Sequence, residues 1–106
     1  MNVQIVISGM LHLKNIEINS NENKFVFNGV DKDIDINNFC KKLASIVTNW
    51  EENMNLGIMM DLEKYSIVFK NNDGRVKKYC GNAYVPANYK NFLDLIKEVE
   101  NAKAKL

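Results

Sequence analysis

The chain has 106 residues, of which 46% are hydrophobic and 25% are charged, and these proportions are typical of one globular domain. Its 14 basic and 13 acidic side chains leave a net charge of +1, whereas a dedicated DNA-binding protein needs a larger basic excess to contact phosphates. We therefore expect a single domain over residues 1–106 whose partner is a protein rather than a nucleic acid.

The first half of the chain predicts three strands followed by a helix. The segments VQIVIS (3–8) and HLKNIEIN (12–19) are rich in β-branched residues, and KFVFN (24–28) follows a polar turn, so all three are expected to be strands. Apolar residues then recur at the spacing of an amphipathic helix over 36–50. Asp35 is well placed to cap the first turn of that helix.

The second half repeats this order. The segment 58–70 predicts one long strand or two short ones, and the turn NNDG (71–74) supplies the positive φ that a tight hairpin needs. A further strand, RVKKYC (75–80), follows. After Gly81, apolar residues at helical spacing predict a second helix over 88–103.

The two halves resemble each other. Residues 16–47 and 67–99 each read as strand, turn, strand, glycine, connector and helix, with Gly29 and Gly81 at matching positions. We expect both glycines to lie at strand ends and at least one of them to have a positive φ, a backbone conformation that other residues resist. Chance similarity is the alternative to duplication, but both lead to the same fold class. This is an α+β domain whose antiparallel sheet has about five to six strands, built from two ββα-like units with both helices on one face.

No catalytic residue, cofactor site or metal site is predicted. His12 is the only histidine, so a histidine-assisted nucleophile would have to be Cys40 or Cys80. Both cysteines lie within apolar patterns and lack metal-ligand spacing, which favours two free thiols in a reducing cytoplasm; a single disulfide is the alternative. The start of the chain lacks the basic segment of a signal peptide, so we expect no membrane contact.

The segment between the two units is the first candidate for a binding surface. It carries large apolar residues and several methionines, which are adaptable and common on binding surfaces. Filling of the core is the alternative use of these side chains. The predicted partner-binding residues are Trp50, Leu56, Met59 and Met60.

The basic hairpin over 70–84 is the second candidate surface. Interleaved basic and aromatic residues can follow phosphates and stack on bases, and the residues concerned are Lys70, Arg75, Lys77, Lys78 and Tyr79. Strand alternation places Arg75, Lys77 and Tyr79 on one face of the sheet and Lys78 on the other. A solvated outer face is the alternative interpretation.

These observations favour a small non-enzymatic protein-interaction module, with a protein partner and a homodimer as one form of that partner. The abundance of asparagine and lysine suggests an AT-rich bacterial or phage genome, where small α+β proteins include inhibitors and immunity-type proteins that neutralise toxins. A nucleic-acid-binding module that uses the 70–84 hairpin is the alternative function.

Overall fold

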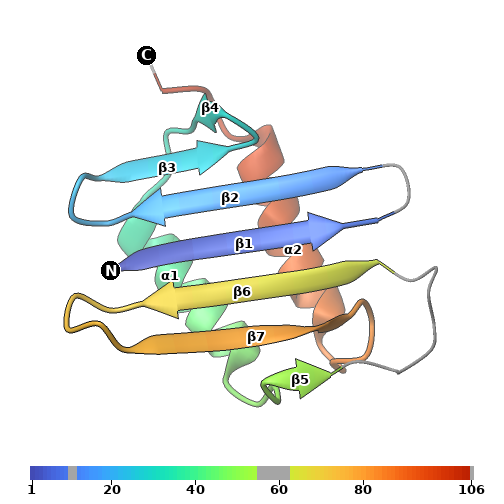
Figure 1. The fold of residues 1–106 in the computed structure, drawn as a ribbon. Helices are drawn as coiled ribbons and strands as arrows, with labels where there is room; N and C mark the ends of the chain where they lie inside the picture. Colours follow the sequence, from blue (N-terminus) through green and yellow to red (C-terminus); the bar gives the residue numbers. More distant parts are fainter. Residues whose placement is uncertain (10–11, 55–62, 106) are drawn as a thin grey trace.

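A single β-sheet, with two helices behind it, makes up the fold in the computed structural model (Figure 1). The structure describes residues 1–9, 12–54 and 63–105. Within these residues the sheet has seven strands in the order β4-β3-β2-β1-β6-β7-β5, and every neighbouring pair is antiparallel except β5 with β7. The strands are β1 (Asn2–Ser8), β2 (Leu13–Asn19), β3 (Lys24–Phe27), β4 (Val30–Asp31), β5 (Asn53–Met54), β6 (Lys64–Lys70) and β7 (Val76–Asn82).

Two amphipathic helices cover one face of this sheet. They are α1 (Ile36–Val47) and α2 (Tyr89–Asn101), and they run side by side across the strands (Figure 1). The predicted cap is confirmed, since Asp35 accepts a hydrogen bond from the backbone N–H of Asn38 at 3.2 Å. Of the apolar residues at helical spacing, Phe39, Leu43, Phe92, Ile96 and Val99 are buried, whereas Ile46 is only half-buried.

The α+β class and the shared helical face are confirmed, but the two ββα units are not structural copies. β2 and β6 both run antiparallel to β1, so they point the same way on opposite sides of it. β3 and β7 are their outer neighbours, and both helices lie behind the same face. These relations make the second unit a reflection of the first. A duplicated unit of L-residues keeps its hand, so only the order of elements repeats.

The two glycines that the repeat pairs have different roles. Gly29 has φ +82° in the turn between β3 and β4, as expected for a conformation that other residues resist. Gly81 lies within β7 and is not among the residues with positive φ. A Cβ at Gly81 would lie 2.8 Å from both the Met54 carbonyl oxygen and the Tyr65 hydroxyl. Gly81 is therefore required for close packing against β5 and β6, which corrects the prediction made for it.

Candidate interaction surface

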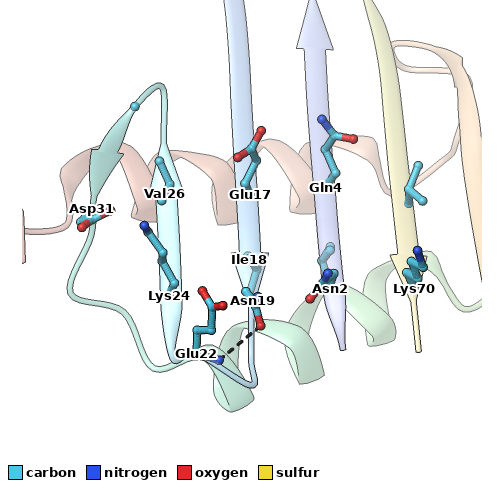
Figure 2. A pocket seen from close by; sticks show the side chains of 13 residues that line it. Asn2, Gln4, Glu17, Ile18, Asn19, Glu22, Lys24, Val26, Asp31 and Lys70 are labelled. Atoms are coloured by element: carbon cyan, nitrogen blue, oxygen red, sulfur yellow. Dashed lines mark hydrogen bonds between the residues drawn. The ribbon is translucent and has the colours of Figure 1, made fainter. Parts of the chain in front are cut away.

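The face of the sheet turned away from the helices is here called the open face. Strand alternation sends buried residues such as Ile5 toward the helices and their neighbours, such as Gln4, to the other side. Figure 2 shows Gln4, Glu17 and Val26 on this side of their strands, with both helices behind the sheet. The open-face strand residues of β1 to β4, β6 and β7 are Asn2, Gln4, Val6, Ser8, Leu13, Asn15, Glu17, Asn19, Lys24, Val26, Asp31, Lys64, Ser66, Val68, Lys70, Val76, Lys78, Cys80 and Asn82.

A shallow hollow of about 660 Å³ lies on the open face. Its floor crosses five strands from β4 to β6, and Figure 2 shows the residues around it. Val26 and Val68 are half-buried there, and the exposed Gln4 lies between them, adjacent to Val68 on β6. At its corners the open face exposes two further apolar side chains, Leu13 and Val76, each 60% accessible to solvent. The surface is thus part apolar and concave, a combination that suits a macromolecular contact.

The charges of the open face are separated across the sheet. The side formed by β2, β3 and β4 carries Glu17, Asp31 and one cation, Lys24. On the side formed by β6 and β7, the charged open-face strand residues are all cations. They are Lys64, Lys70 and Lys78. The open-face residues of β1, which lies between the two sides, are uncharged.

None of these six charged side chains belongs to an ion pair between residues that the structure describes. The five ion pairs found there are His12–Glu63, Lys14–Glu100, Lys42–Glu98, Arg75–Asp73 and Lys77–Glu52. A charged side chain that forms no ion pair within its own chain can pair with an opposite charge on a binding protein. Such complementary charges steer association and select the protein that binds.

Of the predicted partner-binding residues, Trp50 belongs to the core. It is only 7% exposed, and its ring centroid lies 5.0 Å from that of Tyr65 and 5.6 Å from that of Phe92. Its indole N–H donates to Asn88 Oδ1 at 2.5 Å, so the polar group that burial would otherwise leave unpaired is satisfied. Trp50 is therefore not exposed for a partner, contrary to its predicted role. Leu56, Met59 and Met60 lie outside the described residues.

The predicted nucleic-acid residues are divided between the two faces. Lys70 and Lys78 lie on the open face, where both side chains are exposed to solvent. Lys77 and Tyr79 lie on the helix side, where the Lys77 ammonium is 2.8 Å from a Glu52 carboxylate oxygen and 5.6 Å from the Tyr79 ring centroid. Arg75 lies in the turn and pairs with Asp73 at 3.0 Å.

The open-face strand residues include no aromatic side chain in the part of the chain that the structure describes. Proteins that bind single-stranded nucleic acid combine basic residues with aromatic rings on which bases stack. The alternation that separates Tyr79 from Lys78 therefore leaves the basic side of the open face without such a ring.

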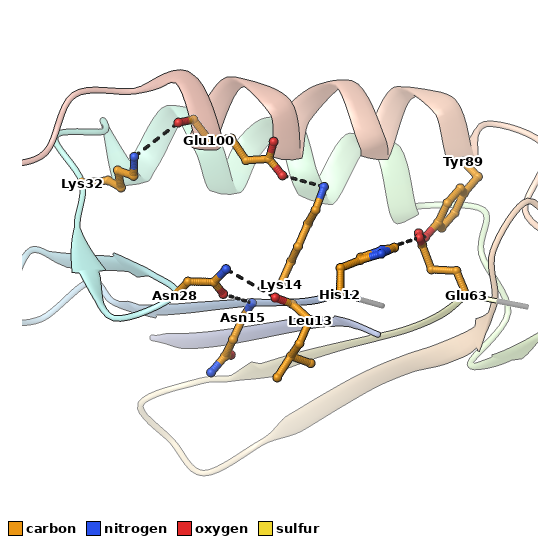
Figure 3. Close-up of polar contacts among 9 residues, drawn as sticks. All are labelled: His12, Leu13, Lys14, Asn15, Asn28, Lys32, Glu63, Tyr89 and Glu100. Atoms are coloured by element: carbon orange, nitrogen blue, oxygen red, sulfur yellow. Dashed lines mark hydrogen bonds and ion pairs between the residues drawn. The ribbon is translucent and has the colours of Figure 1, made fainter. Parts of the chain in front are cut away.

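Polar contacts on the helix side attach α2 to the end of the sheet (Figure 3). One Glu63 carboxylate oxygen lies 2.9 Å from His12 Nε2, and the other accepts a hydrogen bond from the Tyr89 hydroxyl at 3.1 Å. At the other end of α2, the Lys32 ammonium donates to the backbone carbonyl oxygens of Glu100 and Ala102 at 3.3 and 3.0 Å. The only histidine of the chain thus pairs with a carboxylate on the helix side.

The two cysteines are unpaired, as predicted. Both are half-buried rather than fully buried. Cys40 lies on α1, where burial raises the pKa of its thiol. Cys80 lies on the open face of β7, and its thiol donates to the Glu52 carbonyl oxygen at 3.6 Å. A raised pKa lowers the fraction of reactive thiolate at Cys40.

The buried tyrosines Tyr65 and Tyr89 provide a matched test of this packing. Burial raises the pKa of Tyr65 to about 12 and also raises the pKa of Tyr89, which Glu63 raises further. The Tyr65 hydroxyl has no hydrogen-bond partner among the described residues, whereas Tyr89 donates to Glu63. We expect Tyr65→Phe to leave the free energy of unfolding unchanged or raise it, and Tyr89→Phe to lower it by about 1–2 kcal/mol. Urea unfolding measures both, and a larger loss for Tyr65→Phe would contradict the assignment.

No helix in the described residues is both long and apolar enough to cross a membrane. No group of three or more His, Cys, Asp or Glu side chains in that part of the chain is placed to hold a metal ion. No protein-family model matches the chain, and neither a curated protein nor a solved structure matches it.

Proposed function

We propose that this chain is a small non-enzymatic protein-interaction module and that the open face is its binding surface. The observation that carries the proposal is the combination found there: a hollow with half-buried valines, surrounded by charges that have no ion-pair partner among the described residues. Charged residues at the rim and apolar contacts near the centre are the usual composition of a protein interface. A cytoplasmic inhibitor or immunity-type protein is the most concrete form of this function.

A nucleic-acid-binding module is the second candidate. The observation that favours it is the set of three lysines on the open face of β6 and β7. No carboxylate lies among the open-face residues of those two strands. Phosphate contacts alone would give binding that weakens steeply as salt is added. The lack of an aromatic ring among the described strand residues of this face makes protein the favoured partner.

The segment that carries Leu56, Met59 and Met60 remains part of the proposal as a second contact region. Apolar side chains of this size contribute strongly to an interface when a partner covers them. A Met59→Asp substitution is then expected to weaken association far more than it lowers the free energy of unfolding.

The proposal is tested by immobilising the wild-type chain and two variants and comparing the proteins that each one binds from a lysate of the source cells. Gln4→Arg places a long charged side chain at the hollow, and because Gln4 is exposed the fold is expected to survive. Lys90→Glu is the control, since Lys90 is exposed on α2, behind the sheet. We expect Gln4→Arg to lose the bound protein, as detected by mass spectrometry, and Lys90→Glu to keep it.

Two results would contradict the proposal. One is a bound protein that Gln4→Arg retains as fully as the wild type does. The other is salt-sensitive binding to DNA or RNA that is abolished by Lys70→Gln with Lys78→Gln, since both side chains lie on the basic side of the open face. That second result would favour the alternative function.

A further inference from the structure

We infer that the partner of the open face is a second copy of this chain, packed open face to open face about a two-fold axis that runs along β1. This inference rests on the proposed function, because it names the occupant of the same surface. It follows from three properties of that surface: the separation of its charges, the position of the uncharged strand, and its area.

A two-fold axis along β1 places the side of each copy that carries Glu17, Asp31 and Lys24 over the basic side of the other. One row of the open face, read across the sheet from the strand register, is Asp31, Val26, Glu17, Gln4, Val68 and Lys78. Gln4, on β1, lies at the axis. Lys78 is two strands from Gln4 on one side, and Val26 is two strands from it on the other.

Rotation about that axis therefore brings Lys78 of one copy over Val26 of the other, between Glu17 and Asp31. Each dimer contains this contact twice because a two-fold interface is isologous. Lys78, Glu17 and Asp31 have no ion-pair partner among the described residues of their own chain. A different protein would need a surface with basic and acidic sides spaced to match this one, whereas a second copy of the chain presents such a surface by symmetry.

The area of the open face suits a concentration-dependent dimer. Strand β3, with four residues, and β2, β1, β6 and β7, with seven each, give a face of about 500 Å² per copy at a strand spacing of about 4.8 Å and a rise of about 3.3 Å per residue. Two such faces bury about 1,000 Å² in total, which is near the lower limit of specific protein interfaces. Two sheets packed face to face in this way would form an aligned sandwich.

Two opposite charge reversals provide the test. Lys78→Glu alone places like charges against Glu17 and Asp31 of the other copy, and Glu17→Lys alone places like charges against Lys78. We expect each variant to raise the dissociation constant of the dimer by about tenfold or more. Mixing the two variants leaves one contact as in the wild type and brings the two new opposite charges together at the other, where Asp31 still opposes the substituted position 78. The mixture is therefore expected to form a heterodimer that is more stable than the homodimer of either variant.

Sedimentation velocity over about a hundredfold range of concentration measures these equilibria, and Lys90→Glu serves as the control of equal charge change on an exposed helix position. Thermal unfolding verifies that each variant is folded. A dimer that both reversals weaken and the mixture restores would support the inference. A wild-type chain that stays monomeric, or a dimer that neither reversal weakens, would overturn it.

The proposed function is distinguished from this inference by a separate readout. If the chain is monomeric but Gln4→Arg still abolishes retention of a different protein, the open face binds that protein and only the self-association is wrong. If the chain dimerises through contacts that neither Lys78→Glu nor Gln4→Arg affects, and no protein is retained, both fail.

Discussion

Replacing Phe92 by alanine is expected to lower the free energy of unfolding by about 3–5 kcal/mol, the largest effect of any substitution considered for this protein. Phe92 is 0% exposed, and its ring centroid lies 5.5 Å from that of Tyr89 and 5.6 Å from that of Trp50. Truncation removes the transfer free energy of the ring and leaves a cavity. The surrounding aromatic rings come from α2, β6 and the segment after α1, so they cannot all close onto the gap together.

Urea unfolding followed by tryptophan fluorescence measures this loss, because Trp50 is the only tryptophan and its ring contacts the ring of Phe92. Leu93→Ala is the matched control, since Leu93 is the next residue on α2 and is only half-buried. A loss for Phe92→Ala no larger than that for Leu93→Ala would show that the ring is not in a tightly packed core.

Replacing Gly81 by alanine is expected to lower the free energy of unfolding by about 1–3 kcal/mol through overpacking. The added Cβ would lie 2.8 Å from the Met54 carbonyl oxygen, which belongs to the backbone and cannot move away by changing a rotamer. It would also lie 2.8 Å from the hydroxyl of Tyr65 on the neighbouring strand.

The mechanism is tested with a double substitution. Because Tyr65→Phe removes one of the two atoms that the new Cβ would approach, it should recover part of the loss caused by Gly81→Ala. Gly29→Ala is the control, since nothing lies within 4 Å of its Cβ position and its cost of about 1 kcal/mol comes from φ +82° instead. If Tyr65→Phe recovers nothing in Gly81→Ala, close packing is the wrong reason for this glycine.

The separation of charge across the open face depends on which face of the sheet the helices cover. Alternation in β7 predicted that Lys77 and Lys78 lie on opposite faces, and the structure confirms this. It could not decide which of the two lies on the face that the helices cover, because Val76 and Cys80 share a face with Lys78 and are as apolar as a core strand would require. Pairing of β7 with β6 decides it, since Tyr79 lies opposite the buried Ile67.

The local sequence also could not decide whether Trp50, a predicted partner-binding residue, is buried or exposed. Its position at the end of a helical stripe and beside several methionines is compatible with both a core and an exposed anchor. The hydrogen bond from its indole N–H to Asn88 resolves the choice, because it satisfies the only polar group that burial would leave unpaired. Asn88 is 38 residues away in the chain, and no local pattern indicates that these two residues meet.

The sequence by itself determined the two helices and the five longer strands of this protein, because each depends on neighbours in the chain, whereas the two-residue strands β4 and β5 were not predicted. The stripe of α1, the Asp35 cap and the hairpin turn at Gly74, which has φ +89°, are local periods and local backbone preferences. Only the tertiary structure decided that the two ββα segments lie in mirror-related positions around β1, that Gly81 is held by close packing, and that an open face with separated charges exists. These features depend on which strands pair and which face the helices cover, and the free energy that selects them comes from burial between residues far apart in the chain.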